Sequence, residues 1–330
     1  MTTLLFTLVR MVFRADASKK IGTGHVMRST ALAEEAIYQG IPCIFIGDLG
    51  KIDWLEDRVQ NIGFVEILHN EIPFSPNPKS DILIIDSYVL DPNNEFLESD
   101  NWKYVISIAD KVTPEYKCDL IVHPGLDDAW LSHNETNSLS GPDYILIRKS
   151  IKKSELGRNP QTDDLRLLVA AGGADTFGLS LEIAKILDSM DIALQVHFFT
   201  NEKIKSYSGK NFINHEFGPD FDSVAEQIDV VISTASTTCL EFICREIPMG
   251  IVSVVDNQEN YYNELTSKNY ALPLGYYSTE TGWILDTNHI FELLNSENIR
   301  KNLRDNLKGI IDFDGAKRVI SFVKSEISDA

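Results

Sequence analysis

Cysteines are few in this sequence and long apolar runs are absent, and both facts exclude classes of protein. The 330 residues include four cysteines, and none of them forms a C-x-x-C pair. Zinc sites and disulfide frameworks need more cysteines or closer spacing, so we expect free thiols, no metal site and a cytoplasmic location. No stretch approaches the roughly 20 apolar residues of a membrane helix, so we expect no membrane insertion.

Residues 1–10 are apolar but lack the basic start and the small-residue cleavage site of a signal peptide. They are interpreted either as an extension or as part of the first strand.

Basic residues are also scarce. Lysine and arginine number 30 against 49 aspartates and glutamates, which gives a formal net charge of −19. A surface of that sign repels nucleic acid and anionic membranes, so neither is an expected partner. Helix N-termini and single basic side chains can still bind an anionic small molecule. We expect such a ligand, bound by a monomer or a weak homo-oligomer.

A complete dinucleotide fingerprint is missing as well. Residues 21–28 read I-G-T-G-H-V-M-R, and Met27 stands where the third glycine of G-x-G-x-x-G would be expected. The stretch therefore argues against a nicotinamide or flavin enzyme, and no cofactor is expected.

Apolar runs alternate with amphipathic stretches along the whole chain. The runs read as strands that are buried on both faces, and the amphipathic stretches read as helices. This alternation predicts an α/β protein with largely parallel sheets. The predicted strands cover residues 11–14, 43–46, 81–85, 103–108, 120–123, 165–170, 193–199, 230–233 and 250–255.

A plan of strand, glycine turn and helix occurs twice, at residues 12–39 and again at 165–190. The polar stretch at 152–164 between them has no apolar period and reads as a linker. We therefore predict two Rossmann-like, doubly wound domains, at residues 1–155 and 165–330. The amphipathic helix at 316–327 either completes the second domain or crosses back to the first.

The first glycine turn is a candidate catalytic site, because ligands of doubly wound folds bind at the carboxyl ends of the strands. Gly22 and Gly24 allow positive φ and a close approach of ligand. His25 would begin the helix, where the helix dipole favours a neutral imidazole that can accept a proton. Asp16 ends the preceding strand and could orient the ring. The alternative interpretation is that His25 is only a turn residue.

The second domain contains two turns suited to phosphate. One is A-A-G-G-A-D at 170–175, which includes Gly172 and Gly173. The other follows the strand at 230–233, where Ser236, Thr237 and Thr238 offer hydroxyls and backbone amides. Each turn alone is a common helix cap. Together they indicate a nucleoside diphosphate.

Three further polar residues extend this candidate nucleotide-sugar site. Glu241 lies one turn into the helix after the second turn, where its carboxylate can accept both hydroxyls of a ribose. Asn257 and Gln258 follow the next strand and offer neutral donors and acceptors to sugar hydroxyls or amides.

These segments resemble a known family. F-R-A-D-A-S-x-x-I-G-x-G-H-V-M-R at 13–28 is similar to the opening of the UDP-2,4-diacetamido-2,4,6-trideoxy-β-L-altropyranose hydrolases of pseudaminic acid biosynthesis and of related spore-coat polysaccharide proteins. The resemblance continues at 84–91, 117–122, 141–148, 172–175, 237–242 and 256–260.

The resemblance implies a fold of the glycosyltransferase-B type, with two Rossmann-like domains facing across a cleft. It implies water attack on the anomeric carbon of a UDP-sugar, release of UDP, and no metal. His25 would be the general base and Tyr88 an active-site residue. Arg14, Arg28 and Arg148 would bind sugar substituents or phosphate, or support the cleft. The product would enter nonulosonic acid or surface polysaccharide synthesis.

The chain departs from the family pattern at several positions. Ser87 stands where the family has histidine, and Ala235-Ser236-Thr237 replaces a glycine-rich turn. These changes concern the sugar and the phosphate turn, so a related deoxy or N-acylated sugar nucleotide is an open alternative. A glycosyltransferase of the same fold and a non-catalytic nucleotide-sugar binding protein also stay open.

Overall fold

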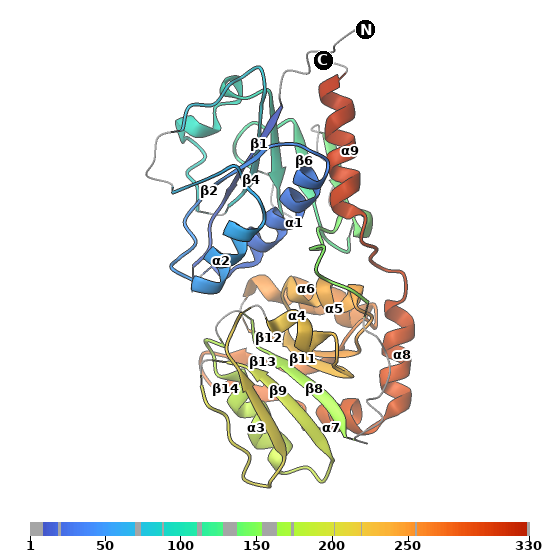
Figure 1. Cartoon of the computed structure of the whole chain (residues 1–330). Coiled ribbons are helices and arrows are strands. Elements are labelled where there is room, and N and C mark those ends of the chain that lie inside the picture. The colour runs from blue at the N-terminus through green and yellow to red at the C-terminus, as the bar shows by residue number, and fades with distance from the viewer. Residues whose placement is uncertain are drawn as a thin grey trace. The chain divides into compact units, whose positions relative to one another are not determined.

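The computed structural model describes two compact units (Figure 1). Unit 1 comprises Met1–Lys149 with Asp312–Ala330, and unit 2 comprises Ser150–Ile311. The boundary between the units, after Lys149, therefore lies just before the polar stretch at 152–164 that the sequence predicts to be a linker. The residues described are 9–18, 21–69, 74–87, 89–110, 114–127, 137–153, 164–172, 175–200, 202–218, 220–254 and 256–328.

Unit 1 is a parallel sheet with helices, in which the described strands have the order β3-β2-β1-β4-β5-β6-β7. The order reverses between β1 and β4, as it does in doubly wound folds. The strands are β1 Arg10–Ala15, β2 Cys43–Ile46, β3 Glu66–Leu68, β4 Asp81–Asp86, β5 Tyr104–Ile108, β6 Leu120–His123 and β7 Asn137–Ser140; the helices are α1 Gly24–Tyr38, α2 Asp53–Asn61 and α9 Gly315–Ser328, with short 3₁₀ turns at Glu95–Leu97, Ser99–Asn101 and Pro142–Tyr144.

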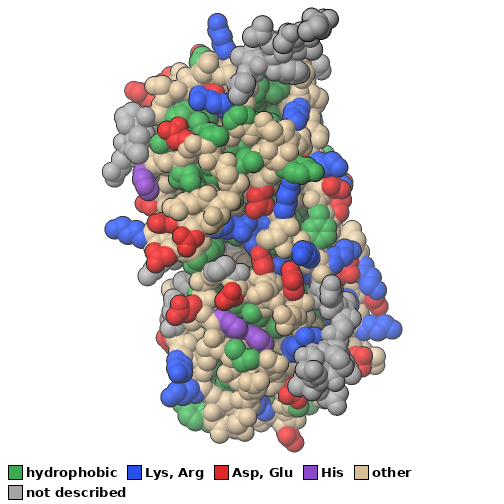
Figure 2. All heavy atoms as spheres, viewed as in Figure 1, with side chains coloured by type: hydrophobic (Ala, Val, Ile, Leu, Met, Phe, Trp, Pro, Cys, Tyr) green, Lys and Arg blue, Asp and Glu red, His purple; other side chains and the backbone are tan. Residues whose placement is uncertain are grey.

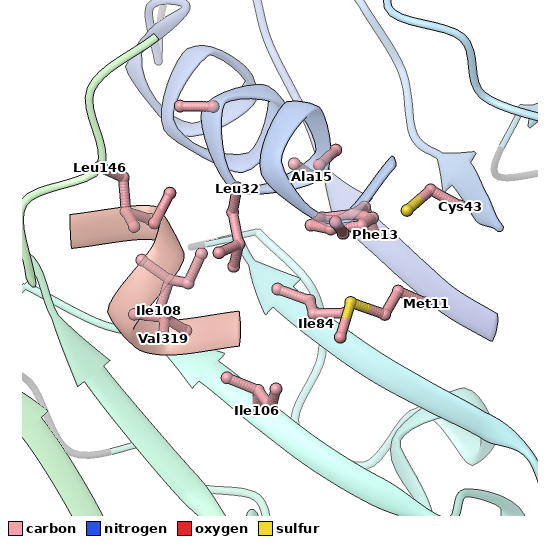
Figure 3. Close-up of a cluster of buried hydrophobic side chains, with 14 of the residues drawn as sticks. Met11, Phe13, Ala15, Leu32, Cys43, Ile84, Ile106, Ile108, Leu146 and Val319 are labelled. Carbon is pink, nitrogen blue, oxygen red and sulfur yellow. The ribbon is translucent and has the colours of Figure 1, made fainter. Parts of the chain in front are cut away.

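Side chains of β1 alternate between two hydrophobic clusters, one on each face of the sheet. Met11 and Phe13 pack with α1, α2 and α9 in the larger cluster, whereas Val12 packs with Leu97 and Trp102 on the opposite face. Figure 3 shows the larger cluster, with Leu32 of α1 beside the strands. Burial on both faces explains why these strands read as continuous apolar runs.

The C-terminal helix α9 belongs to unit 1, where it lies alongside α1 (Figure 1). Val319 of α9 is fully buried in the larger cluster (Figure 3). The first residue of α9 lies very close to the backbone of Ile145. A Cβ on Gly315 would lie only 2.1 Å from the carbonyl oxygen of Ile145. Of the two positions that the sequence allows for this helix, the structure shows the return to the first unit.

Unit 2 repeats the architecture. Its described strands have the order β10-β9-β8-β11-β12-β13-β14, parallel except for β14, and the order reverses between β8 and β11. The strands are β8 Leu165–Ala170, β9 Leu194–Phe199, β10 Asn211–His215, β11 Val230–Thr234, β12 Met249–Ser253, β13 Leu272–Ser278 and β14 Gly282–Leu285; the helices are α3 Leu179–Asp188, α4 Asp220–Ala225, α5 Thr238–Cys244, α6 Asp256–Ser267, α7 Thr287–Asn295 and α8 Glu297–Leu307.

The same ionic clamp joins the two central strands of each sheet at their amino ends. In unit 1, Arg10 donates Nε and Nη2 hydrogen bonds of 2.9 and 2.6 Å to the two oxygens of Asp81. In unit 2, Arg166 makes the equivalent two-point contact with Asp229, at 3.1 and 3.0 Å. Such forked pairs fix geometry as well as charge, so they hold the strands in register.

Acidic and basic side chains are both present over the visible face of the molecule, with hydrophobic side chains in small groups among them (Figure 2). Within the described ranges, the structure contains no helix of the length and apolarity that crossing a bilayer requires.

The Asp81 clamp makes the stability of unit 1 depend on pH. Burial raises the pKa of this carboxyl, but hydrogen bonds from Arg10 and the Asn77 amide outweigh burial and hold the pKa below its usual value. A lowered pKa stabilises the folded state above the unfolded pKa, and that contribution is lost as the pH falls through the folded pKa.

We therefore expect Asp81→Asn to reduce the free energy of unfolding at pH 7 by about 2 kcal/mol, the scale for a charged hydrogen bond. The difference from wild type should shrink below pH 4 in urea titrations. Asp57→Asn makes the same chemical change at an exposed site on α2 and should have no measurable effect. Equal loss at pH 3 and pH 7 would contradict the ionic origin.

Candidate functional site

The polar residues of unit 1 gather where β1 and β4 end, at the reversal of strand order. Gly22 adopts a φ of +81° and exchanges backbone hydrogen bonds with Ser18, which closes the turn that leads into α1. This φ favours glycine, as the sequence predicts. Gly24 instead takes helical geometry as the first residue of α1, so its expected positive φ is not found.

His25 is the second residue of α1 and is held by a carboxylate from β4. Its Nδ1 lies 2.5 Å from Oδ1 of Asp86, the last residue of that strand. A carboxylate accepts hydrogen bonds, so Nδ1 carries a proton in this contact. His25 is 8% exposed and Asp86 is fully buried. The arrangement fixes the orientation of the ring.

Arg28 lies one turn further along α1 and binds the same carboxylate, with its Nη2 3.3 Å from Nδ1 of His25. Its Nε and Nη2 donate to Asp86 at 2.6 and 2.7 Å, and its Nη1 donates to Asp110 at 2.6 Å. Burial alone lowers the pKa of the Arg28 guanidinium, but the charges of Asp86 and Asp110 raise it well above its usual value. Arg28 is therefore a fixed cation that positions Asp86.

Asp16 does not fill the role that the sequence suggested for it, because Asp86 occupies the Nδ1 position of His25. The Asp16 carboxylate accepts hydrogen bonds from the Asp48 amide at 3.0 Å and the Ser87 hydroxyl at 3.1 Å, and it forms an ion pair with Arg14. The register places Asp86 opposite Ala15 and on the side of α1. Strand alternation therefore gives the contact with His25 to Asp86.

The two predicted phosphate turns of unit 2 begin side by side, because they follow the paired strands β8 and β11. The Ser233 hydroxyl donates to the carbonyl of Ala170 at 2.9 Å. Gly172 has a φ of +77°, and a Cβ there would lie 3.7 Å from Oγ1 of Thr234. The described residues of the two turns are therefore adjacent, and Gly173 lies outside the described residues.

Within the turn after β11, only some of the expected amides are available to a ligand. The amides of Ala235 and Ser236 donate to Val252 and Thr234. In the described part of the chain, the Thr237 and Thr238 amides have no backbone acceptor, and the buried Ser236 hydroxyl has no hydrogen-bond partner. Of the backbone amides at 235–238, only those of Thr237 and Thr238 can therefore bind an anion.

Three other predicted residues have more limited support. Glu241 is half-buried in the first turn of α5. Gln258 uses its side-chain oxygen to accept from the Val254 amide at 3.2 Å. Arg148 is 6% exposed in unit 1. Tyr88 and the side chain of Asn257 lie outside the described residues.

The acidic pair of the site, Asp86 and Asp110, is absent from the sequence-based candidates. A signal for Asp86 was available, because a carboxylate that ends the apolar run D-I-L-I-I-D is buried and needs partners. Asp110 has no comparable signal, since its role depends on the position of Arg28 in space.

No protein-family model matches the chain. It is similar to the UDP-2,4-diacetamido-2,4,6-trideoxy-beta-L-altropyranose hydrolase of Campylobacter jejuni, with 24% identity over 287 residues, which cover 81% of this chain and 100% of that protein. The resemblance that the motifs carry is therefore confirmed over most of the chain.

Solved structures show the fold. MurG of Acinetobacter baumannii has a TM-score of 0.64 at 13% identity and covers 96% of this chain and 99% of its own. CalG4, the calicheamicin glycosyltransferase, has a TM-score of 0.64 at 15% identity, with coverage of 97% and 98%. The chain thus has the glycosyltransferase-B fold, and the prediction of two Rossmann-like domains of that class is correct.

The buried charges around Asp86 predict a stability test. Asp86→Ala leaves the Arg28 cation and the His25 ring without their shared partner, so it should cost about 3–5 kcal/mol of unfolding free energy. Asp110→Ala should cost about 1 kcal/mol or less, because its side chain is 39% exposed and Arg28 keeps its fork. Chemical denaturation of both variants measures the difference, and equal costs would refute the central role of Asp86.

Proposed function

We propose that this protein hydrolyses a UDP-linked deoxy or N-acylated sugar to the free sugar and UDP. The similarity to a UDP-sugar hydrolase over most of the chain supports the substrate class. The observation that carries the proposal is the His25–Asp86 pair, which fixes the orientation of an imidazole at the strand ends where doubly wound folds bind ligands.

In this mechanism, unit 1 supplies the base. His25 Nε2 takes a proton from water while the water oxygen forms a bond to the anomeric carbon. The bond from that carbon to the β-phosphate oxygen breaks, and its electron pair leaves with UDP. Asp86 stabilises the imidazolium that forms on His25 and keeps the ring in one orientation. Attack opposite the leaving group inverts the anomeric configuration.

Unit 2 binds the leaving group in the same proposal. The Thr237 and Thr238 amides donate to the diphosphate, and the adjacent turn at Gly172 allows a close approach. Fixed donors of this kind stabilise the charge that develops as UDP departs. Glu241 accepts the ribose hydroxyls, and Gln258 and Asn257 contact the sugar.

Transfer to an acceptor is the second candidate, because the chain shares the fold of solved glycosyltransferases. In that reaction an acceptor hydroxyl replaces water, and His25 serves as the same base. A time course of UDP release from a panel of UDP-linked N-acetylated and deoxy sugars, without acceptor, separates the two. Release of UDP with a free reducing sugar supports hydrolysis, whereas tight binding without release favours transfer or simple binding.

His25→Ala should abolish turnover, because no other group takes the proton from water, while the affinity for UDP should stay within about twofold. His69→Ala removes an exposed histidine of the same unit and should leave both quantities unchanged. UDP release is measured by a coupled assay and UDP affinity by calorimetry. Near-native turnover of the His25 variant would rule out the general-base role.

Glu241→Ala should weaken UDP binding by about 1–3 kcal/mol, the cost of lost hydrogen bonds to a charged group. The same titration with Glu292→Ala, which changes an exposed glutamate of α7, should give the wild-type affinity. If the two variants bind UDP equally, Glu241 does not contact the ribose.

A further inference from the structure

Arg14 is an unusual arginine in unit 1, because its guanidinium is buried without making a hydrogen bond to the described part of the chain. The residue is 5% exposed. Its recorded contact is an ion pair in which Nη1 lies 2.6 Å from Oδ2 of Asp16, and that contact lacks hydrogen-bond geometry. Buried polar atoms normally have hydrogen-bond partners, so the unused donors of Arg14 point to a partner outside the described chain.

Other arginines at strand ends and helix starts show the contrast. Arg10, Arg28 and Arg166 each donate two hydrogen bonds to one aspartate. This forked contact is the usual way in which a guanidinium serves the fold. Arg14 has an aspartate within reach and does not use it in this way. Its role is therefore different from that of a structural clamp.

The carboxylate of Asp16 is held in place by other groups. Oδ1 accepts from the Asp48 amide, and Oδ2 accepts from the Ser87 hydroxyl. Asp16 therefore balances the charge of Arg14 through the contact with Nη1 and makes no hydrogen bond to Nε or Nη2. Nη1 is buried. Nε and Nη2 donate to no acceptor in the described part of the chain, so they are the two donors considered for a ligand.

The position of Arg14 ties it to the candidate catalytic site. It is the residue before Ala15, and Ala15 lies opposite Asp86 in the register of β1 and β4. Arg14 has the same strand parity as Val12, so it belongs to the opposite face of the sheet from His25. A ligand that lies across the carboxyl ends of these two strands can contact both residues.

The charge of the pair limits the chemistry of the ligand group. Arg14 and Asp16 together are neutral and buried. A phosphate would add negative charge next to the Asp16 carboxylate, whereas an amide carbonyl oxygen accepts two N–H donors and adds none. We propose that Arg14 is a specificity residue that binds the carbonyl oxygen of an N-acyl group on the sugar. This inference rests on the proposed function for the identity of the ligand.

The test compares two probes that differ at one substituent, UDP-N-acetylglucosamine and UDP-glucose, with UDP itself as the reference. Calorimetry should show that the wild type binds the acetamido probe more tightly than UDP-glucose. Arg14→Met should weaken binding of the acetamido probe by about tenfold or more, the scale for hydrogen bonds from a charged donor. Its affinities for UDP and UDP-glucose should not change.

Two further variants make the result decisive. Arg14→Lys keeps the charge beside Asp16, so it should fold even if Arg14→Met is unstable. Lysine lacks the forked donor pair, so this variant should also lose the preference for UDP-N-acetylglucosamine over UDP-glucose. Arg10→Met changes another arginine on the same strand and should retain the preference for UDP-N-acetylglucosamine. A preference that is absent in the wild type, or unchanged in both Arg14 variants, overturns the inference. Failure of UDP to bind at all refutes the proposed function instead.

Discussion

A single buried carboxylate organises the polar end of unit 1. Asp86 lies at the end of an otherwise apolar strand, and a charge in that position is tolerated only when it is paired and hydrogen-bonded. Arg28 supplies the opposite charge and His25 supplies a further donor, both from the first turns of α1. The carboxylate therefore fixes the start of the helix against β4, and with it the orientation of the imidazole.

In both units, the contacts that hold the central strands together and the candidate ligand-binding groups lie at opposite ends of the strands. At the amino ends, an arginine and an aspartate clamp the central pair of strands in each sheet. At the carboxyl ends, the polar groups are arranged around turns and helix starts, and several donors have no partner within the described chain. Doubly wound sheets bind their ligands at this second edge. Because both units have the same architecture, the sequence shows the pattern of strand, glycine turn and helix twice.

The strands inside each sheet were predictable because burial on both faces makes them apolar throughout. Residues 43–46, 120–123 and 165–170 match β2, β6 and β8 in full. The strands β3, β7 and β10 were missed because they lie toward or at the edges of their sheets, where short and polar segments such as N-S-L-S carry little hydrophobic signal. The β13–β14 hairpin was missed for the same reason, since most of its side chains are half-exposed.

The site was predictable only as far as it is local in sequence. The glycine turn, His25 at the helix start and the paired turns of unit 2 follow from neighbouring residues. The partners do not, because strand register decides whether Asp16 or Asp86 meets the imidazole. The same holds for the amides of residues 235 and 236, which are engaged by distant and local carbonyls that the sequence does not reveal.

The return of α9 to unit 1 has a consequence for how the chain is made. Unit 1 is built from two separate stretches, and the whole of unit 2 is synthesised between them. Chains fold as they emerge, N-terminal part first, so the apolar surface that Val319 and its neighbours cover stays open on the ribosome until α9 appears. The unit that carries His25 is thus completed after unit 2, although its first strand is translated before unit 2 begins.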